Sequence, residues 1–226
     1  MGPVRSERAA ALRGLYAITP ETEDTAWLAA RVEECLEGGA RIVQYRAKGL
    51  RPAAALEQAS RLARACRAAG AALIVNDSVA LALQAGADGV HLGRDDADVA
   101  AARATFPRAI IGVSCYAEPE RARAAARAGA DYVAIGSMFA SPTKPAAARA
   151  SPAHLAQARR LSGLPVAAIG GITIANAPGL VAAGADMLAV ISALFDAPDV
   201  RAAARAFAAL YAASPRHDVR DQPRAV

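Results

Sequence analysis

The stretch LIVNDSVALALQAGADGVHLGRDD, residues 73–96, contains the pattern that decides the fold. Two short apolar runs, LIV (73–75) and GVHL (89–92), flank a longer segment that ends in AGAD (85–88). Glycine readily adopts the left-handed conformation that ends a helix, so AGAD predicts a helix terminus followed at once by a strand. Polar residues follow each apolar run. The stretch therefore predicts a strand–helix–strand unit with polar side chains where each strand ends.

The same unit recurs along the whole chain. Related turn sequences are GGARIV, AGAALIV, AGADYV and AGADML, and the stretches between the apolar runs show helical spacing, as at Leu28, Val32 and Leu36. The runs are rich in β-branched residues, which is typical of strands covered on both faces. Eight alternating units predict an α/β protein that forms a single (β/α)8 TIM barrel. A doubly wound sheet is the alternative, but it usually has fewer strands and a glycine-rich turn after the first. The eight runs are GLYAI (14–18), RIVQY (41–45), LIV (73–75), GVHL (89–92), IIGVS (110–114), YVAIG (132–136), VAAIG (166–170) and MLAVI (187–191).

Length and composition fit one folded domain. The chain has 226 residues, of which 54% are hydrophobic and 21% charged, and this excludes a disordered chain. We expect the barrel to occupy residues 14–213. The polar segments 1–13 and 214–226 are expected to be frayed and disordered, respectively.

Several classes of protein are excluded by local patterns. The net charge of +5 comes from arginines scattered on helical stretches such as RARAAARAG (121–129), without interleaved aromatic residues, so a nucleic-acid partner is not expected. Three cysteines without a CxxC pair predict neither zinc nor a disulfide framework. Residues 164–185 carry no charge, but glycines and a proline interrupt them, so no membrane span is expected. Because no signal-peptide pattern is present, we expect a cytoplasmic protein.

Polar side chains gather where the predicted strands end. Gln44, Arg46 and Lys48 alternate in QYRAK, and a period of two places them on one face. Asn76 and Asp77 follow the third run, and Ser114 ends the fifth. Because active sites of (β/α)8 barrels lie at the carboxyl ends of the strands, we expect these side chains to share one site.

The types of side chain in this set indicate a chemistry. Asp77 and Asp96 offer the hard oxygen ligands that Mg²⁺ takes together with substrate phosphates. Only two of the 26 basic residues are lysines, Lys48 and Lys144, and both fall on predicted catalytic loops, where with Arg46 they could bind a diphosphate. Backbone N–H groups after the seventh and eighth strands commonly hold a phosphate in this fold. The sequence therefore predicts two phosphate-bearing ligands and a diphosphate leaving group.

Other polar residues have structural interpretations. We expect Asp95 to cap the helix that follows it, and His91 to be a satisfied barrel residue rather than a general base. Cys115 is expected to be a small packed residue, since no base is placed beside it. Tyr45 and Tyr116 are each compatible with either the core or the pocket wall.

A set of motifs, in order from Leu15 to Phe195, resembles the thiamine phosphate synthase family. The resemblance implies a (β/α)8 barrel that joins a hydroxymethylpyrimidine diphosphate to a hydroxyethylthiazole phosphate and releases diphosphate, with one Mg²⁺ per subunit. Two small phosphate-bearing substrates are thus the expected partners, and a homodimer is allowed. The motifs are LYAIT, VQYRAKG, LIVNDSVALALQAGADGVHLGRDD, IIGVSCY, ADYVAIGSMFASPTKP, VAAIGGIT and MLAVISALF.

The resemblance also implies roles for individual residues. It makes Arg46, Lys48, Lys144 and Ser114 the catalytic set. The implied contacts of the pyrimidine diphosphate are Gln44, Tyr45, Arg46, Lys48, Asn76, Ser114 and Lys144; those of the thiazole phosphate are Ser141, Pro142, Thr143, Gly171, Ile191 and Ser192; and the metal ligands are Asp77 and Asp96.

The chain departs from the family pattern at a few positions. Arg94 stands where many relatives have glutamine, Tyr116 where they have histidine, and Ser141 and Pro142 open a loop that usually reads Thr-x-Thr-Lys. The sequence also allows two other functions. A related thiazole tautomerase would need no diphosphate site, and a non-catalytic phosphate-binding barrel predicts gaps in the polar set. The complete set favours the synthase.

Overall fold

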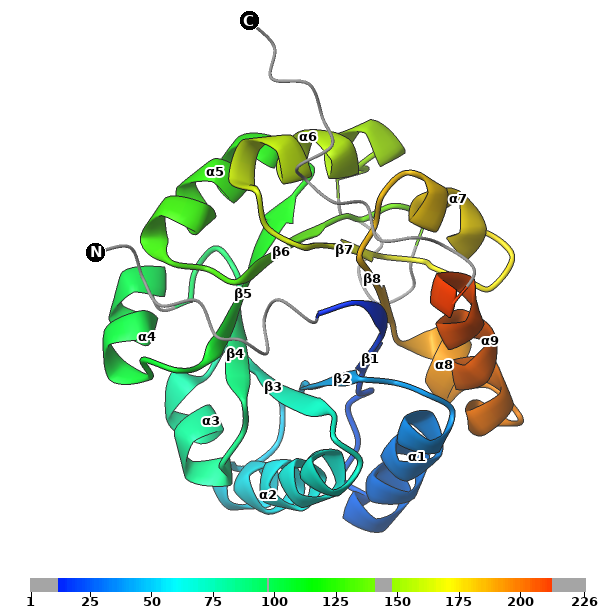
Figure 1. Ribbon diagram of the computed structural model, residues 1–226. Coiled ribbons are helices and arrows are strands. Elements are labelled where there is room, and N and C mark those ends of the chain that lie inside the picture. The colour runs from blue at the N-terminus through cyan, green and yellow to red at the C-terminus, as the bar shows by residue number, and fades with distance from the viewer. Residues whose placement is uncertain (1–11, 97, 141–147, 213–226) are drawn as a thin grey trace, which may run out of the picture.

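The computed structural model describes residues 12–96, 98–140 and 148–212, and in this part of the chain eight parallel strands form a closed barrel (Figure 1). Each strand pairs with the next along the chain, and β1 closes the ring by pairing with β8, with Gly14 opposite Met187. This confirms the predicted (β/α)8 barrel. The strands are β1 (Gly14–Ile18), β2 (Ile42–Tyr45), β3 (Ala72–Asn76), β4 (Gly89–Leu92), β5 (Ile110–Tyr116), β6 (Tyr132–Ile135), β7 (Val166–Ile169) and β8 (Met187–Val190).

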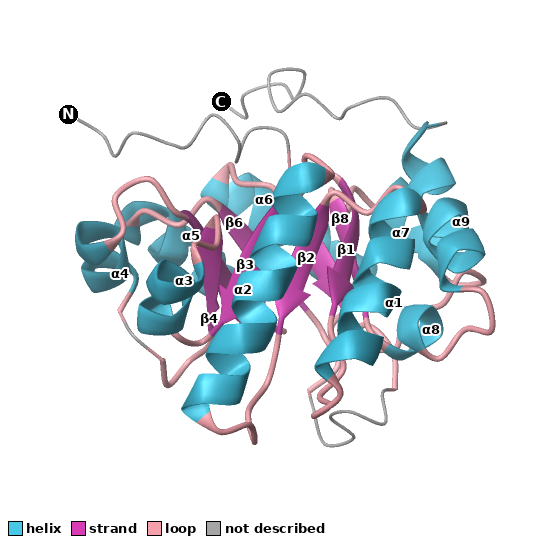
Figure 2. Cartoon of the chain, turned by 90° about the horizontal axis from the view of Figure 1, so that it is seen from below, coloured by secondary structure: helices cyan, strands magenta, loops and turns pink. Residues whose placement is uncertain are grey.

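Helices surround the barrel and cover its outer face (Figure 2). Glycines in the left-handed conformation end several of them, as the turn sequences predicted: Gly86, Gly129 and Gly163 have φ of 67°, 100° and 66°. The helices are α1 (Thr25–Glu37), α2 (Pro52–Ala68), α3 (Val79–Ala85), α4 (Val99–Thr105), α5 (Pro119–Ala128), α6 (Pro152–Ser162), α7 (Ala177–Ala182), α8 (Ser192–Phe195) and α9 (Val200–Ala212).

One predicted helix cap is wrong. Helix α4 begins at Val99, and Asp98, not Asp95, is its cap: the Asp98 carboxylate accepts hydrogen bonds from the N–H groups of Ala100 and Ala101. The capping geometry requires the acceptor immediately before the first helical turn. Asp95 lies too far upstream to provide it.

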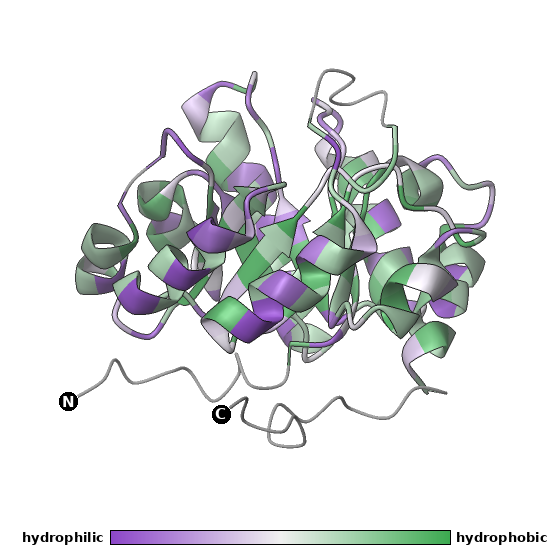
Figure 3. Ribbon diagram, turned by 90° about the horizontal axis from the view of Figure 1, so that it is seen from above, coloured by the Kyte–Doolittle hydropathy of each residue, from purple (hydrophilic) through white to green (hydrophobic). Residues whose placement is uncertain are grey.

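Alternation along each strand creates two hydrophobic layers. In β2, Ile42 packs inside the barrel, whereas Val43 and Tyr45 pack outside it against the helices. The outer layer is rich in alanine, which lets the helices approach the strands closely. Hydrophilic residues lie mainly on the outward surfaces of the helices and in the loops (Figure 3).

Three aspartates hold the amino-terminal ends of neighbouring strands together. Asp88, Asp131 and Asp186 each precede an even-numbered strand and accept a hydrogen bond from a backbone N–H of the strand before it, at 3.0, 2.8 and 2.8 Å. Arg103 and Arg159 pair with the second and third of these carboxylates. The AGAD segments thus end a helix and begin a strand, as the sequence predicts, and their aspartates have structural partners.

Three further predictions concern the cysteines, membrane-spanning helices and the two ends of the chain. All three cysteines are buried and free, and Cys115 has no exposed surface. No helix among the described residues is long and apolar enough to cross a membrane. The frayed and disordered ends predicted for residues 1–13 and 214–226 fall almost entirely outside the described residues.

Candidate active site

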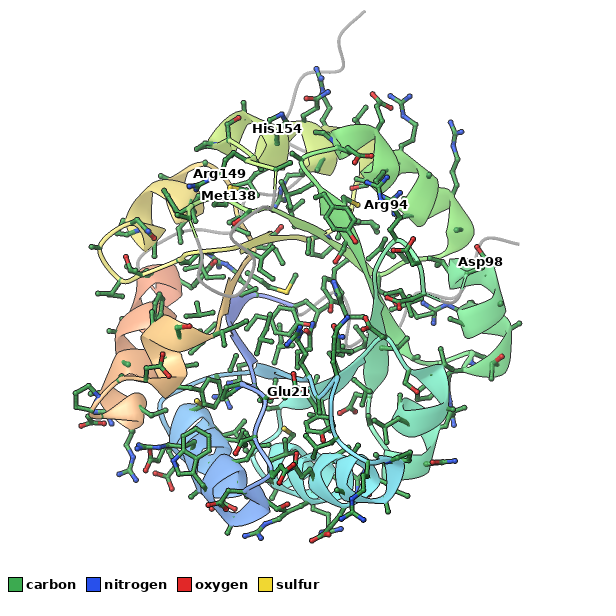
Figure 4. The ribbon with its side chains drawn as sticks, turned by 180° about the vertical axis from the view of Figure 1, so that it is seen from behind. Glu21, Arg94, Asp98, Met138, Arg149 and His154 are labelled. Carbon is green, nitrogen blue, oxygen red and sulfur yellow. The ribbon has the colours of Figure 1, made fainter. Side chains whose placement is uncertain are left out.

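A cavity of about 750 Å³ opens at the carboxyl ends of the strands. All eight strands contribute to its wall, which combines apolar residues such as Ile18 and Ile169 with the polar ends predicted from the sequence. Figure 4 views the barrel from the opposite side to Figure 1, with Glu21 and Arg94 on different sides of its mouth. The residues that line the cavity include Tyr16, Gln44, Arg46, Asn76, His91, Arg94, Ser114, Tyr116, Glu118, Gly170, Gly171, Ile191 and Ser192.

The end of β2 presents alternate residues to the cavity. Gln44 and Arg46 line it, whereas Tyr45 is 1% exposed and donates a hydrogen bond from its hydroxyl to Gln58 Oε1 of α2, at 2.9 Å. The side chain of Tyr45 therefore lies between barrel and helix, away from the cavity. Period-two alternation turns this side chain outward, so any contact of Tyr45 with the pyrimidine substrate would involve its backbone, and the contact stays a prediction.

Residues of the β1–α1 loop contact Arg46 and hold it in place at the end of β2. The Arg46 N–H donates to Thr19 Oγ1 at 3.0 Å, and its guanidinium lies 3.8 Å from Glu21 Oε2. Glu21 also accepts a hydrogen bond from the N–H of Gly49, so it holds the turn after β2. Thr19 and Glu21 were not predicted as site residues, because nothing in the β1–α1 sequence shows that the loop folds over β2.

Lys48, Asp77 and Asp96 come together at the rim, from three different loops. Lys48 Nζ lies 2.9 Å from Asp77 Oδ2, and Asp96 Oδ2 accepts the N–H of Gly93 at 2.5 Å. Asp77 adopts the left-handed conformation, with φ of 64°. For a residue with a Cβ this conformation is costly, and such strain tends to occur at functional sites.

The two carboxyl groups are close enough to influence each other's ionisation. Burial acts to raise the pKa of Asp77, but hydrogen bonds with the Lys48 ammonium and with Asp96 outweigh it and hold that pKa below its ordinary value. Burial and then the neighbouring Asp77 raise the pKa of Asp96, against the opposite effect of the Gly93 N–H. A pair of facing carboxyl groups is electrostatically unfavourable unless a cation or a proton lies between them.

This pair fits a magnesium site that the substrate completes. No cluster of three or more carboxylate, histidine or cysteine side chains that could hold a metal ion occurs in the described ranges, so these residues alone do not form a full cage. Mg²⁺ is usually held by one or two carboxylates plus substrate phosphates and water. Asp77 and Asp96 are the residues that could supply the protein's share of such a donor set.

A chain of hydrogen bonds crosses the floor of the cavity. Gln44 Nε2 donates to the Tyr16 hydroxyl at 2.7 Å, and the hydroxyls of Tyr16 and Tyr132 lie 2.6 Å apart. His91 follows, with Nδ1 2.9 Å from the Tyr132 hydroxyl and Nε2 2.9 Å from Ser114 Oγ. His91 is thus satisfied on both ring nitrogens, as predicted. The two tyrosines were missed, although both occupy inward-facing strand positions.

The β7 and β8 ends form the opposite wall. Gly171 has φ of 60°, and a Cβ on it would lie 2.2 Å from the carbonyl oxygen of Ala140, so only glycine fits. Ile191 and Ser192 stand at the start of α8. Within the described part of the chain, the N–H groups of Gly171 and Ser192 donate to no partner. The predicted residues Ser141, Pro142, Thr143 and Lys144 lie outside the described residues.

A cationic group lies at the rim beside β5. The Arg94 guanidinium is 5.1 Å from the centre of the Tyr116 ring and pairs with Glu118, and the Arg121 guanidinium is 5.7 Å from the same ring. Tyr116 has φ of 54°. Tyr116 therefore belongs to the pocket wall, which resolves the alternative that the sequence left open.

Comparison with known proteins now identifies the family. The family model described as thiamine monophosphate synthase matches residues 15–194, which include every strand from β2 to β8 and nearly all of β1. The chain belongs to the thiamine monophosphate synthase family. The thiamine-phosphate synthase of Thiobacillus denitrificans is 59% identical over 203 residues, covering 89% of this chain and 96% of that protein. That of Aromatoleum aromaticum is 53% identical over 201 residues, covering 88% and 97%.

Solved structures agree with this membership. Thiamine phosphate pyrophosphorylase from Pyrococcus furiosus superimposes with a TM-score of 0.80 at 35% identity, covering 90% of this chain and 97% of that one. Tryptophan synthase from Mycobacterium tuberculosis has a TM-score of 0.69 at 17% identity, which shows only the shared fold. The chain is an enzyme of thiamine biosynthesis, and its function is that of the family: the synthesis of thiamine phosphate.

Proposed function

We propose that the cavity joins 4-amino-2-methyl-5-(diphosphooxymethyl)pyrimidine to a hydroxyethylthiazole phosphate, or its carboxylate. The bond between the pyrimidine methylene and the diphosphate oxygen breaks, and the thiazole nitrogen forms the new bond to that methylene. The observation that carries the proposal is the division of the cavity mouth. Cations and carboxylates gather at the ends of β2 to β4, while Gly170, Gly171 and the N–H group of Ser192 lie across the mouth at the ends of β7 and β8.

The β2–β4 side is proposed to hold the diphosphate. Arg46 can form paired hydrogen bonds with phosphate oxygens, and Lys48 adds a compact positive charge beside Asp77. A Mg²⁺ held by Asp77, Asp96 and the diphosphate would neutralise the charge that develops on the leaving group. Lys144 is proposed to complete this set from the loop after β6.

The floor of the cavity is proposed to hold the pyrimidine ring. Gln44 and Ser114 present polar atoms there, and Asn76 ends β3 beside them. The aminopyrimidine is electron-rich, so it can stabilise the cation left when diphosphate departs. Little general-base catalysis is needed, which agrees with a His91 whose two nitrogens are already engaged.

The β7–β8 side is proposed to hold the thiazole phosphate. The N–H groups of Gly171 and Ser192 and the Ser192 hydroxyl are donors suited to a phosphate dianion. Ile191 provides an apolar contact, and Ser141, Pro142 and Thr143 are proposed to close over this ligand. The oligomeric state, for which a homodimer is one option, and the cytoplasmic location remain predictions.

The proposal is tested by incubating the purified chain with both substrates and following thiamine phosphate and diphosphate. We expect equal amounts of the two products with Mg²⁺, and at least a hundredfold lower rate in excess chelator. Undiminished synthesis without divalent metal would remove the metal from the mechanism. Conversion of the thiazole substrate alone would instead support the tautomerase.

A further inference from the structure

One carboxylate contacts the turn that follows β2 at two points. Glu21, on the β1–α1 loop at the barrel mouth (Figure 4), accepts a hydrogen bond at Oε1 from the N–H of Gly49, and its Oε2 lies 3.8 Å from Nη1 of Arg46. Lys48 lies between Arg46 and Gly49 in the sequence. Glu21 therefore contacts the chain on both sides of Lys48, in the segment that carries two cations of the proposed diphosphate site.

The two contacts of Glu21 differ in kind. The hydrogen bond from Gly49 has a backbone donor, so it fixes the course of the main chain. The separation of 3.8 Å from Arg46 exceeds the length of an N–H···O hydrogen bond, which is about 2.7–3.2 Å. Among the described residues the Arg46 guanidinium donates no hydrogen bond. Glu21 thus attracts this cation and leaves its N–H groups available to phosphate oxygens.

The loop that carries Glu21 is anchored on the outside of the barrel. Gln58 of α2 is 2% exposed; its Nε2 donates to the carbonyl oxygen of Thr22 at 3.0 Å, and its Oε1 accepts the hydroxyl of Tyr45 at 2.9 Å. These contacts form a closed circuit, from β2 to α2, from α2 to the β1–α1 loop, and from that loop back to the turn after β2. Because buried polar groups that satisfy one another hold their segments rigidly, Glu21 has a fixed support.

Charge alone argues against a glutamate at this place, because a carboxylate beside a diphosphate site repels the ligand. Positioning acts in the opposite direction. Lys48 has a flexible side chain that is 54% exposed, and ordering such a side chain opposes binding. A main chain that already follows its bound course limits where the ammonium can lie, so the ligand has less to order. The sign of the effect of Glu21 on affinity therefore distinguishes repulsion from positioning.

We propose that Glu21 is a positioning residue for the diphosphate. Through the N–H of Gly49 it holds the turn so that Arg46 and Lys48 face the same ligand, and this role depends on its acceptor oxygen rather than on its charge. The inference rests on the proposed diphosphate site at the ends of β2 to β4. It adds to that site a residue that does not itself contact the substrate.

The test separates the acceptor from the charge. Glu21→Gln keeps an oxygen that can accept the Gly49 N–H, whereas Glu21→Ala removes both the oxygen and the charge. Titration calorimetry with inorganic diphosphate and Mg²⁺ gives the dissociation constants. We expect the constant to rise about tenfold in Glu21→Ala, because the turn is released, and to stay equal or fall up to about threefold in Glu21→Gln, because only the repulsion is lost.

Glu37→Ala is the matched control. Glu37 is also an exposed glutamate that pairs with an arginine, Arg201, but both lie on the outer helices α1 and α9. This variant loses the same charge and should keep the wild-type dissociation constant. Circular dichroism melting checks that each chain folds. In steady-state kinetics, Glu21→Ala should raise the KM of the pyrimidine diphosphate and leave that of the thiazole phosphate unchanged, which a general loss of structure would not do.

A second readout needs no ligand. Hydrogen exchange of the Gly49 amide, followed by ¹H–¹⁵N spectra, should be slow in the wild-type chain and in Glu21→Gln and faster in Glu21→Ala. Equal exchange in all three chains would overturn the inference.

The affinities distinguish failure of the inference from failure of the proposed function. An unchanged or tighter dissociation constant in Glu21→Ala, or a Glu21→Gln variant as weak as Glu21→Ala, would overturn the role of Glu21 and leave the diphosphate site in place. Failure of the wild-type chain to bind diphosphate with Mg²⁺ would overturn the proposed site, and the inference with it.

Discussion

The two ends of the barrel use aspartate in opposite ways. At the amino-terminal end, Asp131 is 2% exposed, accepts the N–H of Ile111 at 2.8 Å and pairs with Arg103 at 2.6 Å. At the carboxyl end, Asp77 has 29% of its side chain exposed and faces Lys48 and another carboxyl group, Asp96. The first carboxylate has its partners within the fold. The second retains lone pairs for a ligand.

The basic partners differ in the same way. Arg103 donates to the carbonyls of Pro107, Ala109 and Gly129 as well as to Asp131, so its planar group binds several chain segments together. Lys48 Nζ lies 2.9 Å from Asp77 Oδ2, and its side chain is 54% exposed. Arginine suits fixed multiple hydrogen bonds, whereas lysine provides a mobile point charge. The partners of a carboxylate, rather than its residue type, therefore separate a stabilising aspartate from a candidate catalytic one.

The largest effect is expected at Asp77. Asp77→Ala removes a proposed metal ligand, so we expect kcat to fall about 10³-fold. Because the side chain is at the rim and partly exposed, the melting temperature should change by no more than about 2 °C. Steady-state kinetics and calorimetry on the same preparation measure both. Near-normal turnover would show that Asp77 is not part of the site.

Asp131 is expected to show the opposite pattern. Asp131→Asn leaves the largely buried Arg103 without its counter-charge, which should cost about 3 kcal/mol of unfolding free energy. The kcat of the folded fraction should match the wild-type chain, since the residue lies at the far end of the barrel. Urea denaturation followed by circular dichroism gives the stability. A large loss of kcat at full folding would remove the distinction between the two ends.

Ser192→Asp should separate the two ligands within the carboxyl end. A carboxylate beside the proposed phosphate site repels the thiazole phosphate at short range, and we expect its dissociation constant to rise about tenfold or more. The pyrimidine diphosphate site lies across the mouth and should lose less than threefold in affinity. Separate calorimetric titrations measure this. Equal losses for both ligands would mean that the sites are misassigned.

The smallest effects are expected from exchanging the basic residues. Lys144→Arg keeps the charge, but a guanidinium does not replace a compact ammonium, so kcat should fall several-fold. Arg103→Lys should instead cost about 1 kcal/mol of stability, because a lysine cannot reproduce its four contacts, and should leave kcat unchanged. Steady-state kinetics and urea denaturation of both variants test whether lysine is needed at the site and arginine in the structural contacts. Equal kcat values for Lys144→Arg and the wild-type chain would show that position 144 does not require a lysine.

The sequence predicted the barrel because its signal is local and repeated. Apolar runs, helical spacing and glycine turns are each visible within one strand–helix unit, and GVHL was assigned to the residues of β4, 89–92. The sequence also predicted that Gln44, Arg46 and Ser114 share one site, and all three line the cavity. This follows because the carboxyl ends of parallel strands all lie at the same end of the barrel.

What the sequence did not predict depends on contacts between distant segments. Tyr16 and Tyr132 are 116 residues apart, so no local pattern shows that their hydroxyls meet. Glu21 reaches Arg46 only because the β1–α1 loop folds back over β2. The wrong cap at Asp95 has a local cause: the sequence contains several aspartates before α4, and the chain uses the last of them, Asp98.

The most direct test of the contrast between the two ends is a thermal-shift measurement with Mg²⁺ and inorganic diphosphate. A ligand that binds the folded chain at a hundredfold excess over its dissociation constant adds about 2.7 kcal/mol of stability. We expect the same upward shift in melting temperature for the wild-type chain and for Asp131→Asn, although the latter starts from a lower value. Asp77→Asn should show no shift. A full shift in Asp77→Asn, or its loss in Asp131→Asn, would contradict the assignment of metal and diphosphate binding to the carboxyl end.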